Sequence, residues 1–366
     1  MKPSASLAAD GRRIRIGMRD EIADKTQMIA NRSNRLRSVS KLILLLLSVS
    51  GTVSAQNSSV ERKLPKPGIK EVQVPFASIK PSATIKVGGT ADWVLVTDDA
   101  VWVASTNPYA VLRIDPATNS ITARVTVPGE ACSGLASGFG SIWVPICGKK
   151  PQLVRVDTAK NGIAAMLPIS PAGAEGGITT SEDSVWMVTD KNGPLIRIDP
   201  SSNSVRQRTQ ILPGSYNPWF SDGVVWITGI ESSIVTSVDA ATGKTLESIP
   251  VGSKPRFLTA GGGSVWILNQ GDGTVSRVDE KSRRVIATIP VGIPGSGGDI
   301  GYGGNSVWLT VFDVPLTRID SNTNKVVKQW IGKGGDSLRW GFNSIWITDY
   351  KKGLLLRIPE KQLMQK

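Results

Sequence analysis

Histidine is absent from this 366-residue chain, and cysteine occurs only twice. Without histidine there is no Ser-His-Asp or Cys-His nucleophilic site and no histidine-ligated zinc or iron. The chain also lacks a C-x-x-C pair, a Walker-type phosphate loop and an H-E-x-x-H metal motif. No apolar run approaches the ~20 residues that a membrane-spanning helix requires. These absences exclude many familiar catalytic sites, and they predict no transmembrane anchor.

The first 55 residues indicate an export signal. Basic residues between Arg32 and Lys41 precede the apolar run Leu42–Leu47, and Val53-Ser54-Ala55 supplies small residues before the expected cleavage. We expect translation to start at Met28 and the mature protein to be periplasmic or extracellular. Residues 1–55 hold ten Lys and Arg against four Asp and Glu, so without them the formal net charge falls from +13 to +7. Such a mild basic bias does not predict nucleic-acid binding.

A small-apolar-Trp triplet recurs seven times, at spacings of 38 to 43 residues. A period of roughly 40 residues built from short strands is typical of a β-propeller, with one sheet per repeat. The triplet is apolar at consecutive positions, which indicates a strand buried on both faces. We therefore expect the seven tryptophans to pack between blades. They are Trp102, Trp143, Trp186, Trp226, Trp266, Trp308 and Trp346.

The fifth repeat shows the unit most clearly. Its predicted strands are residues 256–259, 264–268, 274–279 and 284–290, each rich in β-branched and aromatic residues and bounded by Gly, Asn or Asp. In six repeats the third strand ends on an aspartate, whose carboxylate we expect to accept backbone N–H groups of the following turn. These aspartates are Asp115, Asp157, Asp199, Asp239, Asp279 and Asp320.

The seventh repeat lacks a fourth strand of its own, because only residues 360–366 follow Pro359. Residues 83–88 resemble the outer strand at 287–292, so we predict that they complete blade seven and remove an open edge. The sequence thus predicts an all-β, seven-bladed propeller over residues 82–366, with four antiparallel strands per blade. Residues 56–81, which contain four prolines, are expected to form an extended linker or arm.

The two cysteines flank one predicted hairpin. Cys132 opens the inner strand of the second repeat and Cys147 closes the next strand, and their midpoint falls in the turn Gly138–Ser141. Directly opposed residues of a hairpin lie within disulfide range, and export provides an oxidising compartment. We predict a Cys132–Cys147 disulfide; the alternative is a pair of buried thiols.

The sequence of these motifs resembles the YVTN-type and YncE-like exported β-propellers. The resemblance covers about residues 82–366 and rests on Gly-Ser-Val-Trp, Arg-Val-Asp and Ala-Thr-Ile-Pro-Val-Gly, as at 263–266, 277–279 and 287–292. The chain is similar, more loosely, to the streptogramin (virginiamycin B) lyase propellers. That likeness would imply elimination of a cyclic depsipeptide by catalytic His and Glu side chains with a magnesium ion. Because no histidine is present, no residue can take the role of the family's histidine bases.

A ligand site is expected on the face that carries the loops entering each inner strand, which we name the top face. Two tryptophans outside the repeat, several acids and one arginine fall there, a set that suits a small polar or cationic ligand. Solvated loop charges are the alternative interpretation. The candidates are Asp92, Trp93, Glu175, Trp219, Arg256, Asp299 and Asp336.

These observations favour an exported, non-catalytic binding module that presents its top-face loops to a small ligand or a protein partner. The alternative is an enzyme, lyase-like or hydrolase-type, that uses top-face carboxylates and a divalent metal. No cofactor is indicated, although Ca²⁺ or Mg²⁺ at an acidic rim is conceivable. We expect a monomer that does not bind nucleic acid.

Overall fold

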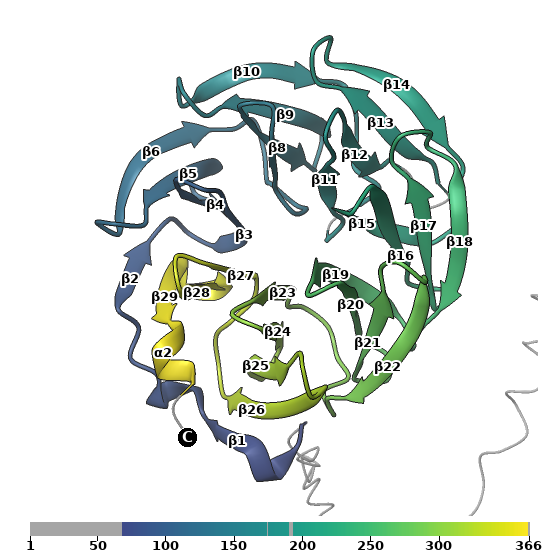
Figure 1. Cartoon of the computed structure of the whole chain (residues 1–366). Helices are drawn as coiled ribbons and strands as arrows, with labels where there is room; N and C mark the ends of the chain where they lie inside the picture. The colour runs from purple at the N-terminus through teal and green to yellow at the C-terminus, as the bar shows by residue number, and fades with distance from the viewer. Residues whose placement is uncertain (1–67, 174, 190–192, 365–366) are drawn as a thin grey trace, which may run out of the picture. The chain divides into compact units, whose positions relative to one another are not determined.

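The computed structural model describes residues 68–173, 175–189 and 193–364. All of them belong to one compact unit, Leu64–Lys366. The predicted export signal and the beginning of the predicted linker lie outside the described residues. Seven small sheets surround a central axis in chain order, as Figure 1 shows by the progression from blue through green to yellow. The predicted seven-bladed, all-β propeller is therefore confirmed.

Each blade is an antiparallel sheet whose strands run from the axis outward. Blade one contains β3 (Ala91–Val96), β4 (Val101–Ser105), β5 (Ala110–Asp115) and β6 (Ser120–Thr126). Blade two contains β7 (Ala136–Gly138), β8 (Ser141–Ile146), β9 (Gln152–Asp157) and β10 (Gly162–Leu167). Blade three contains β11 (Ile178–Thr180), β12 (Val185–Val188), β13 (Leu195–Asp199) and β14 (Ser204–Thr209). Blade four contains β15 (Ser215–Ser221), β16 (Val224–Gly229), β17 (Ile234–Asp239) and β18 (Thr245–Pro250).

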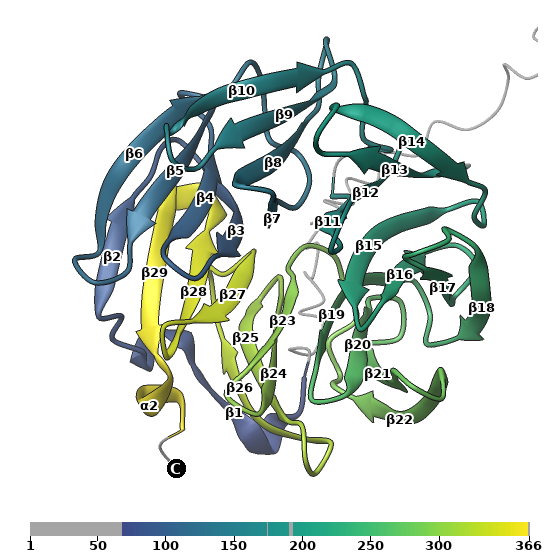
Figure 2. The same ribbon diagram turned by 45° about the horizontal axis from the view of Figure 1, so that its top comes forward.

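Blades five to seven follow the same plan, and Figure 2 shows the strands of blade seven beside those of blade one. Blade five contains β19 (Pro255–Gly261), β20 (Ser264–Asn269), β21 (Thr274–Asp279) and β22 (Arg284–Pro290). Blade six contains β23 (Ile300–Gly303), β24 (Ser306–Val311), β25 (Val314–Asp320) and β26 (Lys325–Ile331). Blade seven contains β27 (Leu338–Gly341), β28 (Ser344–Asp349) and β29 (Leu354–Pro359), with η3 (Tyr350–Lys352) between the last two and α2 (Glu360–Leu363) at the end.

The N-terminal strand closes the ring. β2 (Ala83–Lys86) pairs antiparallel with β29, with Thr84 opposite Leu356 and Ile85 opposite Leu355. Blade seven thereby gains its fourth strand from the beginning of the propeller, as the sequence predicts. The two ends of the ring are held together by backbone hydrogen bonds and by the buried side chain of Ile85.

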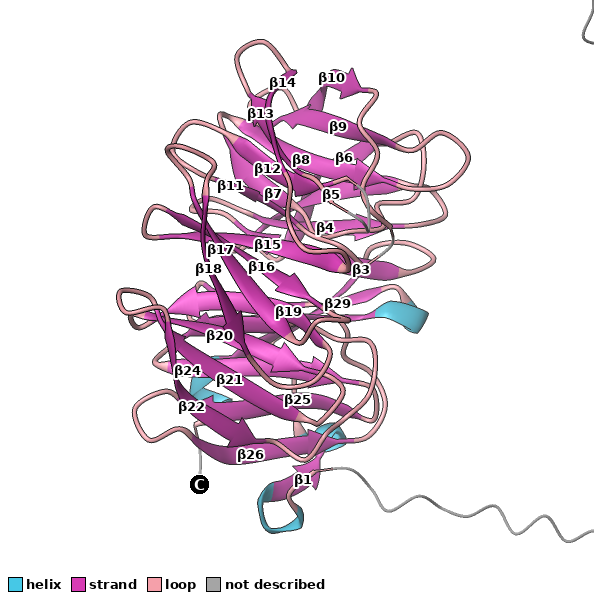
Figure 3. Cartoon of the chain, turned by 90° about the vertical axis from the view of Figure 1, so that its right-hand side faces the viewer, coloured by secondary structure: helices cyan, strands magenta, loops and turns pink. Residues whose placement is uncertain are grey.

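The segment before β2 also contacts the ring. η1 (Lys70–Val72), β1 (Gln73–Pro75) and η2 (Phe76–Ser78) follow one another, and β1 pairs parallel with β26 as a fifth strand on the outer edge of blade six. Gln329 is fully buried beneath it, accepting from the Ile69 amide and donating to the Val291 carbonyl. The last part of the predicted linker is therefore a docked arm. Figure 3 shows β1 at the lower rim of the propeller.

The seven tryptophans of the repeat are all at most 1% exposed. They occupy the second strand of each blade, which is buried almost throughout because neighbouring blades cover both faces of the sheet. This burial confirms that they pack inside the ring. Among the residues that the structure describes, no helix has the length and apolar character needed to cross a membrane.

An arginine on the third strand joins most blades to the next. In blade five, Arg277 stacks on Trp266 with 4.5 Å between the guanidinium carbon and the ring centroid, and it donates to Ser264 Oγ of its own blade. It also donates to the Ser321 carbonyl of blade six at 2.8 Å. We name this arrangement the arginine clip. It recurs at Arg113, Arg155, Arg197 and Arg357, each of which stacks on the tryptophan of its blade and donates to a carbonyl of the following one.

The aspartates that end the third strands have the predicted scaffold role. Asp279 accepts from the Ser282 amide at 2.7 Å, and Asp157 accepts from the Ala159 and Lys160 amides. The other four accept from the turn that follows them in the same way. These hydrogen bonds lower the pKa of Asp157 and Asp279, because they stabilise the ionised carboxylate.

Candidate functional site

The inner strands of all seven blades surround a narrow cavity on the axis of the ring. Its volume is about 40 Å³, enough for on the order of one water molecule. Each blade contributes to the wall, because the inner strands are arranged radially around the axis. The contributing side chains include Trp93, Leu135, Ile178, Trp219, Phe257, Asp299 and Arg339, in blade order.

Side chains from opposite blades close this channel. Trp93 of blade one packs against Phe257 of blade five, with 6.2 Å between ring centroids. Arg339 of blade seven stacks over Trp219 of blade four at 5.5 Å. These blades are not neighbours in the ring, so both contacts cross the axis. These contacts close the channel, and we name the top-face region beside it that carries Asp92, Glu175, Asp336 and Arg256 the mouth, with Trp93 and Trp219 as its floor. Trp93 is only 3% exposed, and its Nε1 has no hydrogen-bond partner within the described chain.

Asp299 anchors the side of the mouth formed by blades six and seven. It is 2% exposed, and its carboxylate accepts from the Ile300 amide, from Ser337 Oγ at 2.8 Å and from the Arg339 guanidinium. Because its lone pairs are used within the fold, Asp299 holds the inner strands together. It is not a free acceptor for a ligand.

Three other acids meet above the floor. Burial raises the pKa of Asp92 well above its ordinary range, and repulsion from Asp336 and Glu175 adds to the effect. Burial, together with repulsion from Glu175 and Asp299, raises the pKa of Asp336 to about 6 despite its hydrogen bond from the Gly298 amide. The repulsion that Asp92 receives from Asp336 and Glu175 indicates that side chains of blades one, three and seven lie near one another.

Glu175 carries the third raised pKa of the mouth. Burial is the main cause, Arg256 opposes it, and Asp299 adds to it. Arg256 is held beside Tyr216 and Phe257, with its guanidinium carbon 5.2 and 5.6 Å from the two ring centroids. The mouth thus contains more carboxyl groups than guanidinium groups, and the pKa values of Asp92, Glu175 and Asp336 are all raised.

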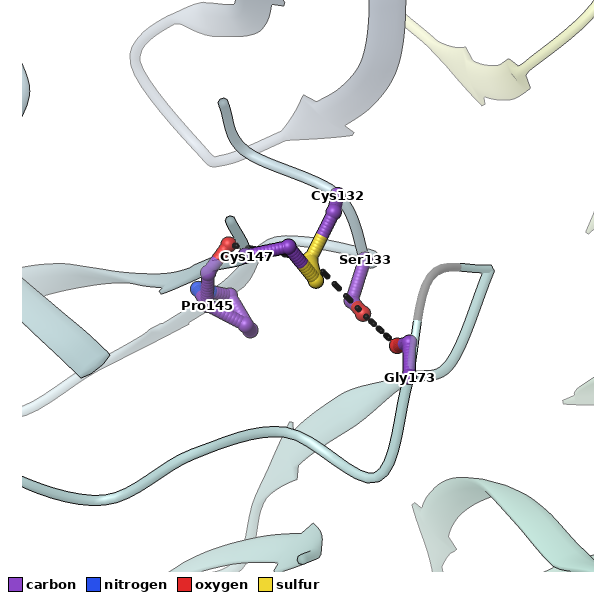
Figure 4. The surroundings of a disulfide bond; sticks show 5 residues. All are labelled: Cys132, Ser133, Pro145, Cys147 and Gly173. Atoms are coloured by element: carbon purple, nitrogen blue, oxygen red, sulfur yellow. Dashed lines mark hydrogen bonds between the residues drawn. A yellow bond between two sulfur atoms is a disulfide. The ribbon is translucent and has the colours of Figure 1, made fainter. Parts of the chain in front are cut away.

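The disulfide lies beside the loop that carries Glu175, and Figure 4 shows it next to Ser133 and Gly173. Cys132 and Cys147 are bonded, with 5.6 Å between their Cα atoms, which confirms the predicted pair. The backbone amide of Glu175 donates to the Cys132 carbonyl at 2.7 Å, and Ser133 Oγ donates to the Gly173 carbonyl at 3.2 Å. The bonded segment of blade two therefore fixes the loop that carries Glu175.

One detail of the disulfide prediction is wrong. The hairpin pairs Ala136 with Trp143 but Ala131 with Ile146, so its register shifts between these two pairs. The cysteines are consequently not directly opposite each other. An irregular stretch at the entrance to β7 causes the shift and still leaves the two residues close enough to bond.

All seven candidate residues lie around the axis, but with different roles. Asp92, Glu175, Asp336 and Arg256 form the mouth, Trp93 and Trp219 form its floor, and Asp299 is part of the scaffold. Sequence reasoning missed Arg339 and Ser337, which hold Asp299 and close the channel. Arg339 occupies the second position of an inner strand, as Arg256 does, and that shared position was the available signal.

Within the described residues, no group of three or more Cys, Asp or Glu side chains has the arrangement of a metal site.

Comparison with known proteins shows the fold alone. The solved structure titled "Streptogramin B lyase structure" matches with a TM-score of 0.63 and 18% sequence identity, over 75% of this chain and 96% of that one. No family model matches the chain, and no curated protein does. The protein is thus a seven-bladed β-propeller whose axial channel is closed by side chains and whose top face carries several acids. Its fold is shared with streptogramin B lyase.

Proposed function

We propose that this protein is an exported, non-catalytic binding module whose mouth takes a small organic cation. The observation that carries the proposal is the convergence of Asp92, Glu175 and Asp336 from three blades on an aromatic floor. Within the described chain, Asp92 and Glu175 form no side-chain hydrogen bond or ion pair. Carboxylates beside the faces of aromatic rings are the usual surroundings of a bound ammonium group.

The electrostatics support a cationic ligand over a neutral or anionic one. Burial, with Asp336 and Glu175 beside it, raises the pKa of Asp92, and burial, with Glu175 and Asp299 beside it, raises the pKa of Asp336, so the ionised forms of both acids are disfavoured. A ligand ammonium would stabilise the ionised forms and drive proton release on binding. The free Nε1 of Trp93 adds a donor for an acceptor atom of the ligand or for a water molecule.

Export is supported by the disulfide, because such bonds persist in oxidising compartments. The N-terminal signal motif is the second argument. The absence of histidine from the sequence supports a role without catalysis, since the lyase-type histidine bases have no counterpart.

The alternative is an enzyme that uses these carboxyls as acid and base, and one observation favours it. A carboxyl with a pKa near 6, next to acids in a closed mouth, suits general acid–base chemistry at neutral pH. The same mouth could then act in a lyase-like or hydrolase-type reaction with a divalent metal.

A thermal-shift screen of residues 56–366 separates these functions. The ligands are polyamines, amino sugars, peptides, neutral sugars, nucleotides, Ca²⁺ and Mg²⁺. We expect amines to raise Tm in the wild type but not in Asp92→Asn/Glu175→Gln, whereas Asp98→Asn, an exposed acid on the opposite face, keeps the response. Stabilisation by a metal that disappears in the double variant would favour the enzyme. No response to any amine would refute the proposal.

A further inference from the structure

We propose that the joint between blades four and five, on the face opposite the mouth, binds a guanidinium group from outside the chain. The group would belong to an arginine side chain or to a small guanidinium compound. This inference does not depend on the function of the mouth.

The arginine clips show what a joint between blades accepts. Arg197 of blade three stacks on Trp186 and donates to both oxygens of Asp183 in its own blade, at 2.9 and 2.7 Å. The same guanidinium donates to the Ala241 carbonyl of blade four at 2.8 Å. One planar cation therefore connects an acid on the earlier blade to an acceptor on the later one.

The joint between blades four and five keeps the clip tryptophan, Trp226, but has lost the arginine and its side-chain acceptors. Ser237 stands where the other blades have the clip arginine, and Val224 stands where blades two, three and five have the accepting serine. Arg283 replaces the asparagine that accepts the clip at Asn119, Asn203 and Asn324. No guanidinium of blade four can therefore reach blade five.

A cavity of about 280 Å³ lies at this joint. Asp222 contributes its blade-four wall, and Glu280 and Lys281 belong to its blade-five wall. Oε1 of Glu280 is shielded from solvent and has no hydrogen-bond partner within the described chain. Asp222 is exposed and likewise forms no hydrogen bond or ion pair there. Two unpaired carboxylates thus border the place that a clip occupies elsewhere.

The neighbouring cations do not fill this place. Arg277 also lines the cavity, but its guanidinium is committed to Ser264 and to Ser321 of blade six. Lys281 is exposed, and Arg283 lies 3.8 Å from Glu247. The joint from blade six to blade seven provides a comparison. It has a cavity beside Glu360, whose Oε1 is also unpaired, yet Arg318 still stacks on Trp308 there. Among the described residues, the joint after blade four is therefore the one whose third strand carries no clip arginine, and the guanidinium that reaches across it, Arg283, comes from blade five and faces Glu247.

A guanidinium can donate to the carboxylates of Asp222 and Glu280 at the same time, because its N–H groups lie in one plane and form paired hydrogen bonds to carboxylates. A buried carboxylate oxygen without a donor is unfavourable, so supplying one gives a gain in binding. An ammonium group is a compact point charge and cannot span two carboxylates in this way. The chemistry of the site therefore favours arginine over lysine.

The test is a calorimetric titration of the exported form with N-acetyl-arginine amide, agmatine and an Ala-Arg-Ala peptide. N-acetyl-lysine amide is the control ligand. We expect one site for the arginine compounds and about tenfold weaker binding of the lysine compound. Tighter binding of the peptide than of agmatine would identify a protein source, and the reverse order a small molecule. Equal binding of the lysine and arginine compounds would overturn the proposal.

Variants locate the site. Glu280→Gln and Asp222→Asn should each weaken binding about tenfold, whereas Asp98→Asn, with the same change of charge on the same face, should not. Ser237→Arg should supply the missing clip, raise Tm and abolish binding. Because that variant places a large side chain at a buried position, the two carboxylate variants decide the outcome if it does not fold. Binding that is unchanged in both of them would refute the proposal.

Discussion

Two aspartates in neighbouring blades show how local surroundings set the role of a residue. Asp299 receives donors from Ile300, Ser337 and Arg339, so its charge is matched inside the fold. Asp336 receives only the Gly298 amide and faces other acids, and its pKa is about 6. Identical side chains are therefore fully paired within the scaffold in one blade and left with a single backbone donor and a raised pKa in the next.

This contrast predicts a pH dependence of stability. A carboxyl whose pKa is raised in the folded state binds its proton more tightly there than in the unfolded chain. Its contribution to the free energy of unfolding is therefore lost as the pH rises from about 4 to 6. We expect Asp336→Asn to be more stable than the wild type by about 1–2 kcal/mol at pH 7, with the difference vanishing near pH 4. Urea unfolding at several pH values measures this. A difference that stays constant across the range would contradict the raised pKa.

Sequence reasoning gathered the acids of the mouth but could not rank them. Positions at the entrance to inner strands place Asp92, Glu175, Asp299 and Asp336 on one face whatever their partners. Side chains of other blades determine which of these carboxylates is paired. Arg339, for example, extends across the axis and contacts Trp219. Such contacts span more than a hundred residues and have no local signal.

At the scale of elements, the arginine clips connect blades more specifically than tryptophan packing alone. Arg277→Met keeps much of the side-chain volume and the contact with Trp266 but removes the donors to Ser264 and Ser321. The loss of hydrogen bonds in a half-buried place should lower the free energy of unfolding by about 2–3 kcal/mol. Denaturant unfolding measures the change. Arg208→Met, on the outer strand of blade three, is the control and should change stability by less than about 0.5 kcal/mol.

Closure by β2 gives a second prediction at this scale. A chain that starts at Gly88 lacks the strand that pairs with β29 and exposes the core around Leu355, so it should not form a stable ring. A chain that starts at Gly68 retains β1 and β2 and should melt cooperatively near the wild type. Circular dichroism and calorimetry of both chains test this. A cooperative transition at the wild-type temperature for the shorter chain would show that β2 is dispensable.

The repeating elements could be predicted because the repeats share one local sequence pattern. Trp spacing, turn aspartates and the likeness of 83–88 to 287–292 each depend on residues close together in one repeat. β1 could not be predicted in this way. Gln73-Val74-Pro75 has no strand pattern, and its pairing depends on Gln329 and on the outer edge of a distant blade.

At the scale of the whole molecule, the ring makes a rigid frame that brings loops from distant repeats together. Blades one, three and seven supply the acids, blade five supplies Arg256, and the disulfide of blade two holds the loop of Glu175. Closure of the channel by Trp93, Phe257, Trp219 and Arg339 turns the axis into a mouth with a floor. The seven-fold architecture therefore accounts for the position of the site, and the departures from the repeat account for its chemistry.

The disulfide gives a prediction that connects the frame to the mouth. Replacing both cysteines by serine should speed hydrogen exchange of the Glu175 and Gly134 amides, because the Cys132 carbonyl that accepts from Glu175 is no longer fixed and the Gly134 amide donates to the Gly176 carbonyl of the same loop. Exchange in blades four to six should stay unchanged. Mass spectrometry of deuterium uptake measures both regions. Uniformly faster exchange throughout the ring would indicate a general loss of stability in place of a local role.

The most direct test of the account is a calorimetric titration of spermidine into residues 56–366 at pH 7.5 and at pH 5. The account predicts binding at pH 7.5, release of protons from the mouth on binding, and several-fold weaker binding at pH 5, where Asp336 is protonated. Asp92→Asn/Glu175→Gln should not bind, and Asp98→Asn should bind as the wild type does. Binding that is equal at both pH values, or that survives in the double variant, would contradict it.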